Sequence, residues 1–491
     1  MDFSRSFRFI CEPSLWARAE ELLAAQGFAL EQDMLLPPAR LARNEPLPLG
    51  LSLAARFGCL YIQDRSSMLP PLALNPSKGA AVLDMCASPG SKTGLLGLLT
   101  GGTGFVLGNE PSAKRLATLR RNMQAQNMLC CASTSYFGDA LPFPTAGAAL
   151  PDTQMAYPGW QAILLDPPCS GWGTADSEPL WQGEKLGALT ALQRRLLAEA
   201  ARVLSPGARV SYSTCTTSVE ENEDQVIYAC QELGFELVPL APPAGFALAA
   251  PKRPGCEGVW RIERDEHGQG FFVALLQKKL IGPSVLDDAN APGLNVSGPN
   301  TLDPDALGSR EKEARHGSAG FFVRPWEKES RHVGERRRHG GARQNGAHSK
   351  KQGANGIFLD RAALAGPYLD PSLLPPGDVA LFGSTAYFLP KARAGLVPSG
   401  MTWKAFALGK MGRKGEIRSF NHLRRLMPGP DALNGAPALV VEDIGPLLDL
   451  VSGQSLAVDA KGPELGLYYK DLPLCRLAVK GGRAVLPNAD F

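Results

Sequence analysis

Residues 80–93 read AAVLDMCASPGSKT. The apolar run Ala80–Met85 is typical of a buried strand, and the small residues after it let the backbone approach a ligand where a helix begins. A phosphate-binding Walker loop has the same setting, but that motif requires adjacent glycine and lysine, whereas Ser91 separates Gly90 from Lys92. The stretch therefore predicts a strand, a ligand-binding turn of another kind, and a helix.

Short apolar runs recur after this turn and alternate with stretches of helical spacing. The apolar runs are Phe105–Gly108, Ala162–Leu165, Ala208–Tyr212 and Gly270–Lys278. The helical stretches are Ala113–Asn127, Leu189–Leu204 and a third that we expect to begin at Ser218, where Ser218 and Glu221 have capping-box spacing. Strand–helix alternation is typical of the α/β class, so we predict a Rossmann-like fold with a doubly wound, mostly parallel sheet.

Three acidic residues follow successive strands of this predicted sheet. Glu110 comes about 20 residues after the small-residue turn, a spacing at which a carboxylate can bind a ribose diol. Asp139 and Asp166 follow the next two strands. Parallel strands end at one edge of the sheet, where such folds bind ligands, so we expect the three carboxylates to line one crevice. Several acids favour a cationic nucleoside such as S-adenosylmethionine over a polyphosphate.

Two cysteines also follow neighbouring strands. Cys169 lies in DPPCSG, residues 166–171, and Cys215 lies in STCT, residues 213–216. Adjacent strands are roughly 4.8 Å apart, so we expect both thiols to face the same crevice. A helix beginning at Ser218 would lower the pKa of the Cys215 thiol and favour the nucleophilic thiolate. The alternative is that each cysteine is a small core residue, the commoner role of a single cysteine.

Histidine and cysteine positions exclude several kinds of site. The chain of 491 residues has six histidines, and the first is His267. Residues 1–266 therefore contain no Ser-His-Asp triad, Cys-His pair or histidine-ligated metal. The ten cysteines form no Cys-x-x-Cys pair and are few for so long a chain. We expect neither a disulfide scaffold nor a zinc ribbon, and no metal.

Charge is distributed unevenly along the chain. The net charge is +3, yet Lys391–Arg425 has nine basic and one acidic residue, and Arg310–Lys351 has twelve basic and five acidic residues. The rest of the chain is therefore acidic, and the basic stretches indicate an appendage that binds a polyanion, with solvated surface charge as the alternative. No apolar run approaches the ~18 residues of a membrane helix, and Met1–Pro13 lacks a signal-peptide pattern. We expect a cytoplasmic protein without membrane contacts.

Several strings, taken in order, resemble the NOL1/NOP2/Sun family of RNA cytosine-C5 methyltransferases. They are YIQDRSSM (61–68), DMCASPGSKT (84–93), LLDPPCSGWGT (164–174), Pro179–Trp181 with LQRRLL (192–197), YSTCTTSVEENE (212–223) and GFFVALLQKK (270–279). The resemblance covers about residues 46–279. The long C-terminal extension is similar to that of bacterial 16S rRNA methyltransferases in this family.

The resemblance implies a role for each candidate residue. It places the cofactor loop at Cys86, Ala87, Ser88, Pro89, Gly90, Ser91 and Lys92. It places the ribose acid at Glu110, the adenine-side acid at Asp139, and Asp166 beside both cofactor and target base. It assigns the nucleophile to Cys215 and a second, release-assisting role to Cys169. The implied cofactor is S-adenosyl-L-methionine, and the implied reaction is methyl transfer to C5 of an RNA cytosine through a Cys215–C6 bond.

Four regions are expected along the chain. Residues 1–78 are interpreted as an N-terminal RNA-binding or lead-in segment, and 79–280 as the methyltransferase domain of class I. Residues 281–356 lose all periodicity and are predicted to be a disordered basic linker. Residues 357–491 have short apolar runs broken by glycine and proline, which predicts a small β-rich or α+β RNA-binding region, RRM-like or PUA-like.

Alternative functions differ in substrate or in class. The expected partner is 16S rRNA or the 30S subunit, with tRNA as the alternative substrate, and the protein is expected to be a monomer. An amino-methyltransferase also uses Asp-Pro-Pro, but its motif normally ends in an aromatic residue, whereas this one ends in Cys169. A non-catalytic RNA-binding assembly factor is a further alternative, which the presence of Cys215 and the cofactor loop disfavours.

Overall fold

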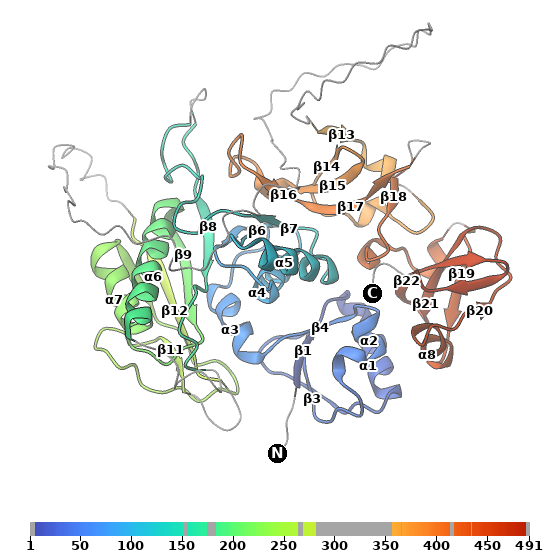
Figure 1. Ribbon diagram of the computed structural model, residues 1–491, viewed down its shortest axis with the longest axis horizontal. Coiled ribbons are helices and arrows are strands. Elements are labelled where there is room, and N and C mark those ends of the chain that lie inside the picture. The colour runs from blue at the N-terminus through green and yellow to red at the C-terminus, as the bar shows by residue number, and fades with distance from the viewer. Residues whose placement is uncertain are drawn as a thin grey trace, which may run out of the picture.

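The computed structural model describes residues 5–150, 155–173, 183–263, 269–280, 356–364, 366–412, 417–433 and 435–487. The predicted linker at 281–356 lies outside the described residues except for Gly356, and so does the Pro179–Trp181 string. The described residues form a central sheet of nine strands, an N-terminal sheet of four, and two C-terminal sheets of five strands each (Figure 1).

The central sheet has the strand order β10–β12–β9–β8–β5–β6–β7–β16, and β11 pairs with β12. The strands are β5 (Ala81–Asp84), β6 (Phe105–Asn109), β7 (Cys131–Thr134), β8 (Trp160–Leu165), β9 (Leu204–Thr214), β10 (Phe235–Val238), β11 (Trp260–Ile262), β12 (Phe271–Lys278) and β16 (Trp403–Lys404). Strands β5 to β9 are mutually parallel, and β10 to β12 join antiparallel at one side. This arrangement confirms the predicted Rossmann-like, mostly parallel sheet.

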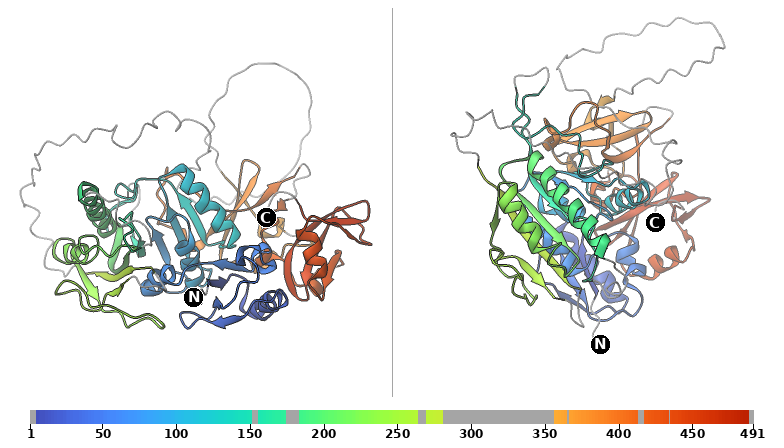
Figure 2. Two further views of the ribbon diagram at one scale, coloured as in Figure 1. Left: turned by 60° about the horizontal axis from the view of Figure 1, so that its bottom comes forward. Right: turned by 60° about the vertical axis from the view of Figure 1, so that its left-hand side comes forward.

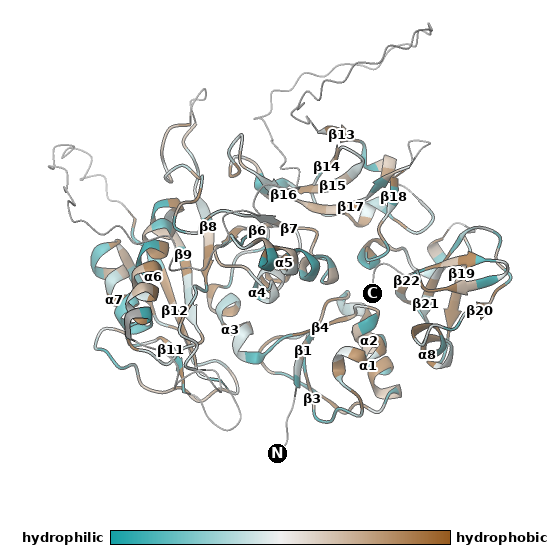
Figure 3. Ribbon diagram, in the orientation of Figure 1, coloured by the Kyte–Doolittle hydropathy of each residue, from teal (hydrophilic) through white to brown (hydrophobic). Residues whose placement is uncertain are grey.

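Helices cover both faces of the central sheet (Figure 2). They are α3 (Arg65–Leu74), α4 (Ser91–Leu99), α5 (Ala113–Ala125), α6 (Gly183–Val203) and α7 (Glu223–Glu232). Side chains alternate along β5, so Val82 packs with Leu116 of α5 on one face, and Leu83 packs with Leu197 of α6 on the other. Hydrophobic strands therefore lie between helices whose outer sides are hydrophilic (Figure 3).

The third predicted helix begins later than its sequence pattern indicates. Helix α7 begins at Glu223, five residues after Ser218. The Ser218 hydroxyl does accept a hydrogen bond from the backbone N–H of Glu221 (3.2 Å), as in a capping box. The Glu221 carboxylate, however, binds Ser170 and Gln193 of another segment instead of turning back toward Ser218. Because these partners hold the Glu221 carboxylate, the reciprocal hydrogen bond of a capping box, from Ser218 N to that carboxylate, does not form.

The N-terminal residues form a folded unit of their own. Its antiparallel sheet has the order β2–β3–β1–β4, with β1 (Arg5–Phe9), β2 (Leu30–Gln32), β3 (Ala39–Ala42) and β4 (Leu60–Ile62). Helices α1 (Trp16–Ala25) and α2 (Leu53–Arg56) pack on it through Leu22 and Leu53, against Phe7 and Phe9. The sequence analysis interpreted residues 1–78 as an RNA-binding or lead-in segment and did not predict this sheet.

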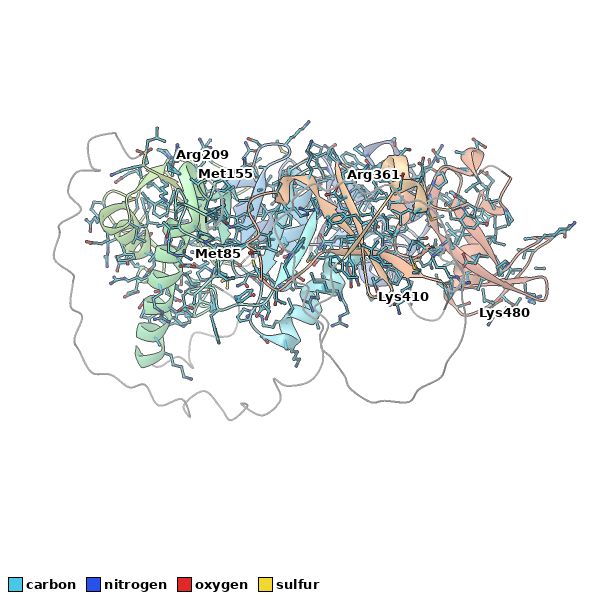
Figure 4. The ribbon with its side chains drawn as sticks, turned by 90° about the horizontal axis from the view of Figure 1, so that it is seen from above. Met85, Met155, Arg209, Arg361, Lys410 and Lys480 are labelled. Carbon is cyan, nitrogen blue, oxygen red and sulfur yellow. The ribbon has the colours of Figure 1, made fainter. Side chains whose placement is uncertain are left out.

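The C-terminal region is β-rich, as predicted. One sheet contains β13 (Ile357–Leu359), β14 (Gly377–Phe382), β15 (Thr385–Pro390), β17 (Phe406–Met411) and β18 (Ile417–Ser419). The other contains β19 (Ala438–Val441), β20 (Leu456–Ala457), β21 (Glu464–Tyr469), β22 (Leu472–Lys480) and β23 (Arg483–Val485), with helix α8 (Gly445–Val451). Lys410 of the first sheet lies nearer the central sheet than Lys480, which lies at one end of the molecule (Figure 4).

Both ends of the C-terminal region contact the rest of the chain. The last sheet shares a hydrophobic cluster with the N-terminal unit, and Lys470 Nζ forms an ion pair with Glu21 at 2.7 Å. Strand β16 pairs antiparallel with β7 and so extends the central sheet. The region is therefore packed onto the N-terminal unit at one place and onto the central sheet at another.

Candidate active site

The turn after β5 lies at the carboxyl edge of the central sheet, as the sequence indicates. Gly90 precedes α4 and has φ +103°, a backbone conformation that glycine adopts without the strain a side chain would bring. A Cβ at this position would also lie 2.9 Å from Leu119 Cδ1, so α5 leaves no room for one. The loop Cys86–Lys92 is thereby held close to α5, with its helix N-terminus open to a ligand.

Asp84, the last residue of β5, is a site residue that the sequence analysis did not single out. Its side chain is buried and accepts a hydrogen bond from Thr93 Oγ1 at 2.7 Å. Its Oδ1 atom has no hydrogen-bond partner among the described residues. Burial raises the pKa of Asp84 to about 7. Its position at a strand end, shared with the three predicted acids, was the signal that could have identified it.

Asn109 is the last residue of β6 and Glu110 follows it directly, and both are buried. The Glu110 carboxylate accepts a hydrogen bond from Ser112 N (2.9 Å) and lies 3.3 Å from Arg115 Nε. Asn109 donates through Nδ2 to Met85 O and Tyr136 O, and accepts from Tyr136 N. Asn109 thus ties together the segments after β5, β6 and β7, and the sequence analysis gave it no role.

Asp139 lies in the segment after β7 and forms an ion pair with Arg195 of α6 at 2.8 Å. The preceding Gly138 packs closely, since a Cβ there would lie 2.7 Å from Leu196 Cδ2 and 3.5 Å from Met85 O. This close approach brings Asp139 beside the turn after β5. Met85 itself lies within the central part of the molecule (Figure 4).

Asp166 follows β8 directly and is held by two polar side chains. Lys92 Nζ donates to Oδ2 at 2.7 Å, and Ser213 Oγ donates to Oδ1 at 2.6 Å. Burial lowers the pKa of Lys92, but the charge of Asp166 and the hydrogen bond to it outweigh burial, so the pKa of Lys92 is raised. Lys92 therefore remains a cation and joins the cofactor loop to the segment that carries Cys169.

The two predicted thiols lie together. Cys169 Sγ and Cys215 Sγ are 3.2 Å apart, and both side chains are partly buried. A hydrogen bond from Cys169 lowers the pKa of Cys215, the positive charge of Lys92 lowers it further, and burial and Asp166 oppose them. The same bond, together with burial, raises the pKa of Cys169. The directions of these two shifts favour Cys215 over Cys169 as the thiolate of the pair.

The direction of the Cys215 pKa shift agrees with the prediction, but the predicted cause is wrong. Helix α7 begins at Glu223, too far along the chain from Cys215 for its dipole to act within the first turn. The thiol of Cys169 and the ammonium of Lys92 take its place. Cys86 differs from Cys215, because burial raises the pKa of its thiol.

Comparison with known proteins places this edge in a methyltransferase domain. Residues 71–277 match the family model described as 16S rRNA methyltransferase RsmB/F. The match covers the site segments from Asp84 to Cys215 and bears out the resemblance seen in the sequence. A methyltransferase domain of this family indicates S-adenosylmethionine as the cofactor.

Curated relatives with the name ribosomal RNA small subunit methyltransferase F match part of the chain. The protein of Salmonella paratyphi A is 33% identical over 308 residues, which are 59% of this chain and 57% of the relative. The protein of Klebsiella pneumoniae is 33% identical over 330 residues, or 65% and 63% of the two chains. The chain thus spans less than two thirds of the length of these relatives.

A methyltransferase homologue from Pyrococcus horikoshii is similar in structure, with 28% identity, a TM-score of 0.47, and coverage of 57% of this chain and 87% of that one. Among the described residues, no group of three or more His, Cys, Asp or Glu side chains has the arrangement of a metal site. The helices that the structure describes include none long and apolar enough to cross a membrane.

Proposed function

Because residues 71–277 carry an RsmB/F methyltransferase domain, we propose that the chain transfers a methyl group from S-adenosylmethionine to C5 of a cytosine in 16S rRNA. The observation that carries the proposal is the pair of thiols 3.2 Å apart at the ends of β8 and β9, beside Asp166. A methyltransferase that acts on oxygen or nitrogen has no need of a paired nucleophilic thiol, whereas the weakly nucleophilic C5 atom does.

The cofactor pocket is proposed to be the carboxyl edge around the turn after β5. Its residues are Cys86, Ala87, Ser88, Pro89, Gly90, Ser91, Lys92, Glu110, Asp139 and Asp166. Two features fit a cationic nucleoside: the unpartnered Oδ1 of buried Asp84, and the buried carboxylate of Glu110 at the end of the next strand. Once bound, S-adenosylmethionine supplies an electrophilic methyl group.

Cys215 is proposed to attack C6 of the cytosine as a thiolate. The new bond removes the aromaticity of the ring and makes C5 nucleophilic, so that C5 can accept a methyl group. The Asp166 carboxylate accepts a hydrogen bond from the N4 amino group of the base, and from N3–H once N3 has taken up a proton from solvent as negative charge develops on the ring, while Lys92 and Ser213 hold the carboxylate in place. The target base has to be unpaired or flipped out to reach this edge.

Cys169 is proposed to assist release. After methyl transfer, C5 carries a proton that must leave before the Cys215–C6 bond breaks. Cys169 Sγ lies 3.2 Å from Cys215 Sγ, and the contact with Cys215 is the largest cause of its raised pKa. In the adduct Cys215 is a thioether and no longer accepts that hydrogen bond, so Cys169 can lose its proton to solvent and take the C5 proton as a base. The electron pair of the C5–H bond then forms the C5–C6 double bond, and Cys215 leaves as a thiolate. Cys169 is thus proposed to act in the elimination step, and Cys215 in the attack on C6.

Within the described residues of the basic stretch, 391–412 and 417–425, the cations do not form one exposed surface but fall into several separate groups. Arg393 pairs with Asp378 at 3.1 Å, Arg425 hydrogen-bonds Glu12, and Arg424 donates to Gly58 O and Ala125 O. Lys391 and Lys410 are exposed. We therefore propose that RNA is bound by such exposed cations of the C-terminal region, and that Arg424 and Arg425 hold this region against the rest of the chain.

Two experiments test the proposal. Transfer of tritiated methyl groups to purified rRNA and tRNA tests catalysis and substrate class, since 16S rRNA is expected to be labelled and tRNA is not. Bisulfite sequencing of rRNA from a deletion strain tests the modified atom, because 5-methylcytosine resists conversion. If only tRNA were labelled, the substrate would be tRNA and not 16S rRNA. If neither RNA were labelled, the result would favour the non-catalytic RNA-binding alternative.

A further inference from the structure

Glu221 is a fully buried carboxylate at the centre of a polar network behind the two thiols. Its Oε1 atom accepts hydrogen bonds from Ser170 N and Gln193 Nε2, both at 3.0 Å. Its Oε2 atom accepts one from Ser170 Oγ at 2.5 Å. The carboxylate therefore binds the backbone and the side chain of the residue that directly follows Cys169.

The same network reaches the segment that carries Cys215. Ser170 Oγ lies 2.7 Å from Thr216 Oγ1, so the residues that follow the two cysteines are in direct contact. Asn222, next to Glu221, donates to Thr216 O at 2.9 Å. Gln193 Nε2 also donates to Pro168 O at 3.0 Å, on the other side of Cys169. The segments that carry Cys169 and Cys215 are thus both hydrogen-bonded to the neighbouring residues Glu221 and Asn222.

The backbone of Glu221 is anchored as firmly as its side chain. Tyr212 of β9 donates from its hydroxyl to Glu221 O at 2.6 Å, and this tyrosine is buried. The carboxylate accordingly cannot move without disturbing β9, whose end carries Cys215. A buried carboxylate with three donors is stable only while all of them stay in place.

We propose that Glu221 is a positioning residue that sets the distance between Cys169 Sγ and Cys215 Sγ. This inference rests on the proposed function, in which the contact between the thiols favours the Cys215 thiolate. In the hydrogen bonds that the structure describes, Glu221 does not contact either sulfur atom and acts through Ser170 and Thr216. The positioning role requires the hydrogen-bonding geometry of the Glu221 side chain and does not require its negative charge.

A glutamine at position 221 preserves that shape. Its amide oxygen can accept from Ser170 N and Gln193 Nε2, and its amide nitrogen can donate to Ser170 Oγ, which then donates to Thr216 Oγ1. Glu221→Ala removes every one of these bonds. The two variants therefore separate a positioning role from an electrostatic one.

Glu223 offers a matched control on the same segment. It is also fully buried, and its carboxylate binds Arg261 Nη1 at 3.0 Å and Lys252 N at 3.0 Å. It makes no contact with the segments around Cys169 and Cys215 in the bonds that the structure describes. Arg261, the partner of Glu223, also donates to Thr217 O at 2.6 Å, two residues after Cys215. The amide oxygen of a glutamine still accepts from Arg261, so Glu223→Gln should lower thermal stability by weakening a buried ion pair and leave the thiol pair in place.

The experiment measures how fast the two thiols are joined by diamide, an oxidant that takes up the two thiol hydrogens as the disulfide forms. Mass spectrometry of the linked peptides identifies the Cys169–Cys215 product. With diamide in excess, one thiolate adds to diamide quickly and attack of the second thiol on that adduct limits the rate. The rate then reports how closely the two sulfur atoms approach, and it does not depend on methylation. If the proposed function is wrong, the crosslinking rate is unaffected by that. The rate therefore tests the positioning role of Glu221 separately from the proposed function. Methyl transfer to 16S rRNA is measured in parallel.

In Glu221→Ala we expect the crosslinking rate to fall at least about tenfold and kcat to fall by roughly a factor of 100, with KM for S-adenosylmethionine unchanged, as for a misplacement of about 1 Å. Glu221→Gln should keep crosslinking and kcat near wild type, and so should Glu223→Gln. If Glu221→Ala does not fold, Ser170→Ala, which removes the Oγ link, should still slow crosslinking. Unchanged crosslinking in Glu221→Ala or Ser170→Ala, or loss of kcat in Glu221→Gln equal to that in Glu221→Ala, overturns the proposal.

Discussion

Trp403 of β16 pairs with Thr134 of β7, so a strand of the C-terminal region extends the central sheet of the methyltransferase fold. The contact extends beyond the strand pair. Thr134 Oγ1 donates to Thr402 O at 2.7 Å, and Thr402 N donates to the Tyr136 hydroxyl at 2.8 Å. Because Tyr136 lies between β7 and Asp139, the C-terminal region supports the adenine side of the proposed cofactor pocket.

Trp403→Ala should therefore destabilise the catalytic fold. The indole is 3% exposed and its ring centroid lies 6.0 Å from that of Phe105. Loss of a buried tryptophan costs roughly 3–5 kcal/mol, which thermal unfolding would show as a clear fall in Tm. The exposed Lys410→Ala is the control, with little expected change. An unaltered Tm for Trp403→Ala would mean that β16 is not part of the sheet in solution. Removal of residues 357–491 would consequently affect stability as well as RNA binding.

Glu110→Ala should weaken the binding of S-adenosylmethionine and leave RNA binding nearly unchanged. Its buried carboxylate is the acid at the end of β6, and it also fixes the start of the next segment through Ser112 N. Isothermal titration calorimetry measures the first effect, and a filter-binding assay with 16S rRNA measures the second. If this variant bound the cofactor with wild-type affinity, Glu110 would not be part of the cofactor pocket.

RNA binding should depend on the exposed cations of the C-terminal region and not on its paired arginines. Lys391→Ala and Lys410→Ala should each weaken binding and reduce the slope of log K against log salt by about 0.7, the value for one phosphate contact on a single strand. Arg393→Ala, which loses an ion pair to Asp378, should leave the slope unchanged. Equal slopes for all three variants and the wild type would exclude this region as the RNA-binding surface.

The pKa of Cys215 should rise when Cys169 is replaced by alanine. The hydrogen bond from Cys169 is the largest cause of the lowered pKa, so its loss shifts the thiolate to higher pH. The rate of alkylation of Cys215 by iodoacetamide, followed against pH, should show its midpoint at higher pH in Cys169→Ala than in wild type. Cys230→Ala, on α7, should leave the midpoint unchanged. A midpoint that does not move would assign the lowered pKa to Lys92 alone.

The sequence allowed the catalytic sheet and most of its edge to be predicted, because both depend on local patterns. The apolar runs around Leu83, Leu107 and Leu164 are continuous, as in strands buried on both faces, and Glu110 and Asp166 stand where those runs end. Once the strand order is given, the two acids are expected to lie at the same edge of the sheet, and no other feature of the sequence is needed. The thiol pair followed in the same way from the adjacency of β8 and β9.

Features that depend on distant partners were not predictable. Strand β16 has two residues, too few for any periodicity, and its partner Thr134 lies far back in the sequence. The later start of α7 depends on Ser170, which takes the Glu221 carboxylate that a local cap would have used. Asn109 lies at the end of β6, and no sequence pattern indicates that its side chain binds Met85 O and Tyr136 O.

The separate roles of the two cysteines are the central claim, and a denaturing gel of protein mixed with 16S rRNA and S-adenosylmethionine tests them most directly. Cys169→Ala should accumulate as a slow-migrating protein–RNA adduct that requires S-adenosylmethionine, since attack and methyl transfer proceed but release does not. Cys215→Ala should form no adduct and transfer no methyl group. An adduct with Cys215→Ala but not with Cys169→Ala would contradict the assignment, and activity in both variants without any adduct would contradict the covalent mechanism itself.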